Sequence, residues 1–203
     1  MSTKNNWPTK KLGGTIQKPK LLKFSERELR WDFYPMFFRL IKKGCKIEAF
    51  LLMLSTWNFA CFRYAVRGFN LDRFIEAIKD VESILKRLWR EDFKTINFDK
   101  YSKEIKKSFQ ILADIKGIQK TGAPKIMHLM APRVFVMWDA YIRDYYGFKK
   151  GDANDYLAFL ELMQKQFPDI KASSGRTAAK LIDEHNYITI TVPALRKNKS
   201  KLR

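Results

Sequence analysis

Asp139 directly follows a tryptophan and an apolar run in the stretch FVMWDAYIRDYYGF. An aspartate just before a helical pattern is typical of an N-cap, where backbone N–H groups donate to the carboxylate. A carboxylate held in this way among apolar residues is also a fixed negative charge, which can stabilise positive charge that develops in a reaction. The sequence therefore leaves two interpretations of Asp139 open, a structural cap and a catalytic electrostatic group.

Three lysines surround a predicted turn upstream of this aspartate: Lys116, Lys120 and Lys125. Gly117 marks the turn, because it interrupts the helical pattern between two short predicted helices. Such a turn presents backbone N–H groups at the start of the second helix, which suits a phosphate oxygen. An ordinary corner between two helices has the same local pattern, so the turn alone does not decide between these interpretations.

The second helix of this pair is predicted to begin at Thr121, a favoured N-cap residue. Pro124 then falls in the first turn, where a missing N–H leaves no hydrogen bond unmade. Ile126 and Met130 continue the apolar face. If Thr121 is the cap, Lys120 lies on the side of the turn that faces a bound phosphate backbone.

The rest of the chain is predicted to be almost entirely helical, because apolar residues recur at helical spacing. The predicted helices are a capped start at Ser25, then Lys46–Val66, Leu71–Trp89, Tyr101–Ile115, Asn154–Phe167 and Ser174–Glu184. Only Tyr187–Val192 (YITITV) is predicted to be extended, since its β-branched residues alternate with period two. The predicted fold class is all-α.

Basic residues dominate the chain, whose formal net charge is +19. Residues 1–24 form a predicted basic arm with six lysines and no acid, and residues 193–203 form a basic tail with five cationic residues and no acid. The predicted helical domain, residues 25–192, carries the remainder of the excess. A field of this sign favours a polyanion such as nucleic acid, and a general solubility bias is the alternative.

The chain contains two cysteines and two histidines. Two cysteines cannot form a disulfide framework, a four-thiolate iron–sulfur cluster or a cysteine-rich zinc site, so no metal and no cofactor are expected. His128 lies within an apolar helix face and is interpreted as a hydrogen-bonded core residue. Because the sequence shows no signal peptide and no apolar run long enough for a bilayer, we expect an intracellular monomer that is not bound to a membrane.

The hairpin and the aspartate together resemble the helix-hairpin-helix (HhH-GPD) DNA glycosylase superfamily. The matching residues are LADIKGIQKTGAPKIMHL for the hairpin, at about 112–130, and the loop 131–139 that ends on the family's essential aspartate. The resemblance is close over residues 112–148 and loose over the remaining helices. It implies an all-α, glycosylase-like helical bundle of one or two lobes.

In that family the hairpin binds the backbone of double-stranded DNA, and the aspartate faces the sugar of a nucleotide flipped out of the duplex. The resemblance implies that Asp139 helps to release a damaged or mismatched base. The implied DNA contacts are Lys116, Gly117, Ile118, Gln119, Lys120, Thr121, Gly122 and Lys125. Trp57, Phe135 and Trp138 are candidate walls of the base pocket, and a plain core role is the alternative for each.

The sequence departs from the family pattern at three places. Gln119 occupies the position of a second hairpin glycine, and the core segment Leu51–Phe59 lacks the family's glutamine, so the base is not identified. Thr121 occupies the position of the lysine that attacks the sugar in bifunctional members, with Lys120 one residue earlier. Hydrolysis without strand cutting is therefore favoured, and Lys120 is the alternative nucleophile.

Two other classes of protein fit the same residues. The first is a non-catalytic helix-hairpin-helix module, in which the hairpin binds phosphate and Asp139 is only a cap. The second is a helical protein–protein adaptor with a basic surface. Base release would separate a glycosylase from the module, and a steep salt dependence of DNA binding would separate both from the adaptor.

Overall fold

The computed structural model describes residues 33–65, 68–172 and 175–200. All regular elements of these residues are helical, which confirms the predicted all-α class. The α-helices are α2 (Tyr34–Lys42), α3 (Lys46–Trp57), α4 (Phe59–Ala65), α5 (Leu71–Leu85), α6 (Ser102–Ala113), α7 (Gln119–Met130), α8 (Ala140–Tyr146), α9 (Ala153–Gln166), α10 (Ala178–Asn186) and α11 (Val192–Ser200). The predicted arm, the helix start at Ser25 and residues 201–203 lie outside the described residues.

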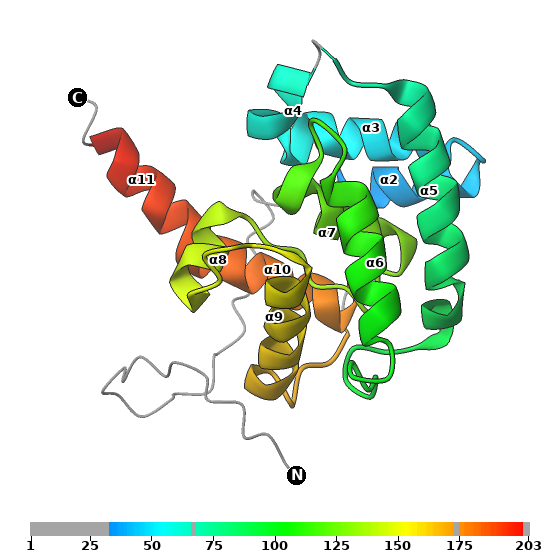
Figure 1. Ribbon diagram of the computed structural model, residues 1–203. Helices are drawn as coiled ribbons and strands as arrows, with labels where there is room; N and C mark the ends of the chain where they lie inside the picture. Colours follow the sequence, from blue (N-terminus) through cyan, green and yellow to red (C-terminus); the bar gives the residue numbers. More distant parts are fainter. Residues whose placement is uncertain (1–32, 66–67, 173–174, 201–203) are drawn as a thin grey trace, which may run out of the picture.

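Helix α6 is the centre of the arrangement, because it packs against α5, α7 and α9. In Figure 1, α2 to α5 lie on one side of the α6–α7 pair, and α8 to α11 lie on the other. One cluster of buried apolar residues runs through both sides, so the described helices share a single core. The α6–α7 pair is the hairpin that the sequence predicts.

Two of the predicted helices are divided in the structure. The segment Lys46–Val66 is two helices, α3 and α4, which Asn58 separates with backbone angles outside the helical region. The segment Leu71–Trp89 is α5 followed by a 3-10 turn, Lys86–Arg90, and Asn70 caps α5 by accepting a hydrogen bond from the N–H of Arg73. Local apolar spacing therefore located these helices but not the breaks within them.

The prediction that Tyr187–Val192 is extended is wrong. Tyr187–Thr191 is a π-helical stretch that joins α10 directly to α11. β-Propensity reflects packing on the half-buried surface of a sheet. The described part of the chain contains no strand with which such a sheet could form. The basic tail consequently begins as helix α11, which points away from the body in Figure 1.

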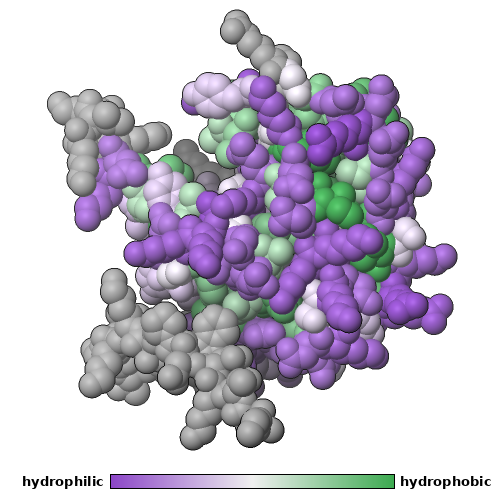
Figure 2. Space-filling view, viewed as in Figure 1, coloured by the Kyte–Doolittle hydropathy of each residue, from purple (hydrophilic) through white to green (hydrophobic). Residues whose placement is uncertain are grey.

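The visible face of the molecule is mostly hydrophilic, with hydrophobic residues exposed in small groups between the charged ones (Figure 2). Among the described residues, no helix has both the length and the apolar character needed to cross a bilayer.

Candidate functional site

The hairpin turn contains two residues in the left-handed backbone region. Gly117 has φ 94° and Gln119 has φ 51°, and Gln119 is the one non-glycine residue with positive φ in the described chain. Residues other than glycine rarely adopt this region, because their Cβ atom crowds the backbone. Gln119 thus adopts the backbone conformation that glycine favours, at the position where the family pattern has its second glycine.

The prediction that Thr121 caps the second helix is wrong. Helix α7 begins at Gln119, and its flanking residue, Ile118, makes no side-chain cap hydrogen bond. Thr121 lies within the first turn, so the turn itself directs the chain into the helix and a capping side chain is not used.

A buried asparagine, Asn58, fastens the hairpin turn to the end of α3. Its Nδ2 donates to the carbonyl oxygens of Gly117 at 3.1 Å and Ile118 at 3.2 Å. Gly122 permits this close approach, because a Cβ there would lie 2.9 Å from both Asn58 Nδ2 and Ile118 Cγ2. Sequence reasoning missed Asn58, and a polar residue inside an otherwise apolar helical run was the available signal.

The three hairpin lysines lie at different depths. Lys116 and Lys120 are exposed, and Lys120 Nζ donates to the carbonyl oxygen of Lys150. Lys125 is only 8% exposed, and its Nζ donates to the carbonyl oxygen of Trp57 at 2.7 Å. Because its ammonium is engaged inside the protein, Lys125 does not form part of the phosphate-facing surface predicted for it.

Burial of Lys125 lowers the pKa of its ammonium to about 8, and the negative charges of Asp139 and Asp183 partly oppose this shift. The Trp57 carbonyl that it binds is at the C-terminal end of α3, where carbonyls lack intrahelical partners. Lys125 therefore acts as an internal cation that closes α3 and lies within the electrostatic reach of Asp139.

The loop that leads to Asp139 runs through the core. Its residues Val134 to Trp138 are buried, so its backbone polar groups require partners within the protein. Thr177 Oγ1 donates to the carbonyl of Pro132, and Tyr156 OH donates to that of Val136. These contacts hold the loop in one position relative to α9 and α10.

His128 binds the same loop and is confirmed as a hydrogen-bonded core histidine. Its Nδ1 contacts the carbonyl oxygen of Phe135, and its Nε2 lies 3.0 Å from Tyr34 OH. Because a carbonyl only accepts, Nδ1 carries the proton and Nε2 accepts from the tyrosine. Burial lowers the pKa of His128 to about 3, so the ring is neutral at physiological pH.

The loop is also tied directly to the hairpin. Pro124 has no N–H, so the carbonyl of Lys120 one turn earlier lacks its helical donor. The indole Nε1 of Trp138 donates to that carbonyl at 2.8 Å. A hydrogen bond from the residue next to Asp139 therefore positions the aspartate relative to the first turn of α7.

Asp139 is confirmed as the N-cap of α8. Its Oδ1 accepts from the N–H of Ile142 at 2.9 Å, and its Oδ2 accepts from Thr191 Oγ1 at 2.6 Å. The residue is half-buried, and the two hydrogen bonds fix the direction of its carboxylate. The sequence does not reveal Thr191 as a partner of Asp139, because the β-branched pattern around it predicts an extended segment.

Further charged groups lie near this carboxylate and near Trp57. Arg143, one turn along α8, has a buried Nη1 without a hydrogen-bond partner, and its guanidinium lies 5.6 Å from the Trp138 ring centroid. Burial lowers the pKa of Arg143, while Asp144 and Asp139 oppose that effect. On α10, Lys180 pairs with Asp183 at 2.7 Å and lies 4.5 Å from the ring centroid of Trp57.

The three candidate pocket aromatics have different environments. Phe135 and Trp138 are buried in the core, where Trp138 packs against an aromatic group that includes Tyr156 and Phe159. In this conformation neither can touch a base, so their core role is the one observed. Trp57 is half-buried beside Lys125 and Lys180 and is the remaining candidate of the three.

The described residues contain no group of three or more histidine, cysteine or carboxylate side chains that could hold a metal ion. Comparison with protein-family models, with curated proteins and with solved structures finds no match to this chain. Its function is therefore inferred from the site itself.

Proposed function

We propose that this protein is a DNA glycosylase that binds duplex DNA, flips out a damaged or mismatched base and hydrolyses its N-glycosidic bond. The observation that carries the proposal is the fixation of Asp139. Both carboxylate oxygens are held, by Ile142 N–H and Thr191 Oγ1, and the preceding Trp138 is hydrogen-bonded to the hairpin helix.

The chemistry requires a fixed anion. As the C1′–N bond breaks, its electron pair leaves with the base and positive charge builds on the sugar. A preoriented carboxylate stabilises this charge without reorganising during the reaction. Each oxygen of Asp139 retains a second lone pair, which can direct a water toward C1′. The water forms the new C–O bond, and the proton that it gives up goes to the departing base, which left with the electron pair of the broken bond.

The proposed reaction leaves the DNA strand intact. A lysine that cuts the strand must first attack the sugar as an amine. Lys120 is exposed at the hairpin and donates to the carbonyl of Lys150, which suits a contact with the DNA backbone more than an attack inside a pocket. We therefore assign Lys120 to DNA binding and water to the nucleophilic step.

Double-stranded DNA as the partner, a monomeric state and an intracellular site belong to the same proposal. Support for the DNA partner comes from the net charge of +19 and from the exposed lysines at the hairpin turn. Phosphate contacts of this kind supply most of the affinity for undamaged duplex.

A non-catalytic DNA-binding module is the second candidate. The observation that favours it is the same pair of hydrogen bonds, since a carboxylate satisfied on both oxygens also serves as a plain cap. In that case the hairpin binds DNA and no base is released.

Asp139→Asn separates these candidates, because asparagine is also a good N-cap but carries no charge. We expect a folded protein in which base release is slowed by roughly 100-fold or more, on the scale of losing an oriented electrostatic group. Release is measured on a panel of duplexes with one lesion each, and the product strand should break only after added alkali.

The matched control is Asp152→Asn, since Asp152 caps α9 in the same way by accepting from the N–H groups of Asn154 and Asp155. It should release bases at the wild-type rate. Wild-type release by folded Asp139→Asn, or no release from any lesion by the wild-type protein, would contradict the glycosylase proposal.

A further inference from the structure

Helix α4 has an anchored inner side. Phe62 packs edge-on against Phe69 with ring centroids 5.4 Å apart, and Phe69 packs against the buried Phe74 of α5 at the same distance. This aromatic chain connects α4 to the core. The helix is thus a firm support for whatever its outer side presents.

The outer side of α4 presents two aromatic rings and a cation to solvent. Phe59 is 57% exposed and Tyr64 is 68% exposed. The guanidinium of Arg63 lies 4.5 Å from the ring centroid of Tyr64 and 5.7 Å from that of Phe59, and its Nη2 donates to Tyr64 OH. We call these three residues the α4 platform.

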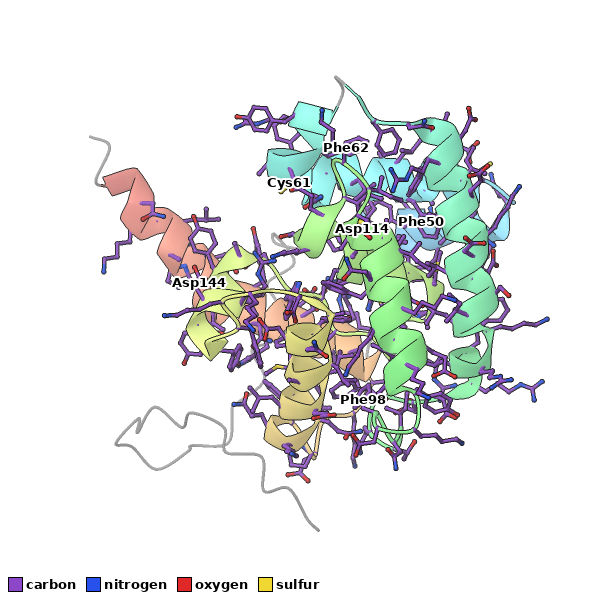
Figure 3. The ribbon with its side chains drawn as sticks, viewed as in Figure 1. Phe50, Cys61, Phe62, Phe98, Asp114 and Asp144 are labelled. Carbon is purple, nitrogen blue, oxygen red and sulfur yellow. The ribbon has the colours of Figure 1, made fainter. Side chains whose placement is uncertain are left out.

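Helix α4, which carries the α4 platform, lies beside the hairpin turn. At the start of α4, Asn58 Nδ2 donates to the carbonyl of Gly117. Beyond the end of α4, a Cβ on Gly68 would lie 3.0 Å from Lys116 Nζ. Contacts at both ends thus place α4 along the turn, and Figure 3 shows Cys61 and Phe62 on the same side of the molecule as Asp114 of the turn.

We propose that the α4 platform stacks on an unpaired nucleobase of DNA held at the hairpin turn. Aromatic rings stack on any base, because every base has a π face, and an arginine beside them adds a cation–π contribution. The neighbouring Lys116 supplies the charge that complements phosphate. The inference rests on the DNA-binding half of the proposed function and does not require that a base be released.

The expected property is a preference for DNA with an unstacked base. The probes are an undamaged duplex and the same duplex with one bulged 2-aminopurine, whose fluorescence falls when the base stacks. The wild-type protein should bind the bulged duplex more tightly and quench the probe. Phe59→Leu with Tyr64→Leu keeps apolar side chains on the helix but removes both rings, and should lower affinity for the bulged duplex roughly tenfold.

That double variant should bind the fully paired duplex like the wild type and should no longer quench the probe. Tyr145→Leu is the control, because Tyr145 is 63% exposed on α8 and lies outside the platform. Equal preference for the bulge in wild type and double variant would overturn the inference, as would an equal loss in Tyr145→Leu. A change in oligomeric state of the double variant with unchanged DNA binding would instead identify a protein-contact surface and also overturn it.

The outcome separates this inference from the proposed function. If the platform variant loses the bulge preference but no lesion is ever cut, the inference holds and the glycosylase proposal fails. If release depends on Asp139 but the bulge preference survives the loss of both rings, the glycosylase proposal holds and the inference fails.

Discussion

Two lysines of helix α7 lie in opposite environments. Lys120, in the first turn, is exposed beside the carbonyl of Lys150, whereas Lys125, in the middle of the helix, is buried against the end of α3. The exposed charge acts through solvent and is screened by salt, while the buried charge acts on its few neighbours with little screening. Depth, and not residue type, therefore decides whether a lysine here presents its charge to solvent or supports the fold.

The difference also separates two parts of the proposed activity. The hairpin turn with Lys116 and Lys120 is expected to hold DNA at long range and without sequence preference. The interior group of Lys125, Asp139 and Thr191 is expected to set local charge and geometry at the sugar. Three changes test whether the two parts are as independent as this division requires.

The largest expected effect concerns Lys125 and pH. Because its pKa is about 8 in the folded protein and 10.5 in the unfolded chain, the folded form binds fewer protons between these values. The free energy of unfolding should therefore rise with pH across that window, by on the order of 3 kcal/mol in total. Lys125→Met should lack this contribution, as measured by urea unfolding at pH 8 and pH 10.

Lys120→Met is the control for this measurement, since Lys120 is an exposed lysine on the same helix. It should keep the wild-type pH dependence. Parallel stability curves for wild type and Lys125→Met would mean that burial of Lys125 is not coupled to folding as described.

The second effect concerns Lys116 and Lys120, the exposed lysines at the hairpin turn. Binding to an undamaged duplex that neutralises roughly five phosphates should show a slope of log K against log salt of about −4 to −5. Lys116→Glu with Lys120→Glu should weaken binding roughly 30-fold at low salt and reduce the slope by about 2. Fluorescence anisotropy over a salt series measures both quantities.

The control is a second double variant, in which two positive charges elsewhere on the surface are reversed and the net charge changes by the same amount. Lys86 and Arg87 are exposed in the 3-10 turn that follows α5. That end of α5 lies away from the hairpin turn in Figure 1. Lys86→Glu with Arg87→Glu should change the slope much less. Equal effects of the two double variants would show that the field of the whole molecule, and not the hairpin, binds DNA.

The smallest effect concerns the backbone of the hairpin turn at Gln119. Gln119 has φ 51°, where glycine carries no steric penalty, so Gln119→Gly should stabilise the protein by about 0.5–1 kcal/mol. Gln110→Gly, at an exposed position inside α6, should destabilise it by about 1 kcal/mol. Chemical unfolding measures both, and destabilisation by Gln119→Gly would mean that the left-handed residue is not strained.

The sequence by itself determined the all-α class, most helix positions, the hairpin and the N-cap role of Asp139. These properties depend on apolar spacing, turn residues and capping preferences, which act over a few neighbouring residues. The burial of His128 followed from the same spacing, because the residue lies on an apolar helix face.

Only the tertiary structure decided which distant groups complete the site. Thr191 reaches Asp139 from 52 residues away, and Asn58 reaches the hairpin carbonyl of Gly117 from 59 residues away. The extended prediction for Tyr187–Val192 failed because packing against α8 and α10 overrides local β-propensity. Lys125 looked like its neighbours in sequence, and its depth depends on where the end of α3 comes to lie, which no local pattern encodes.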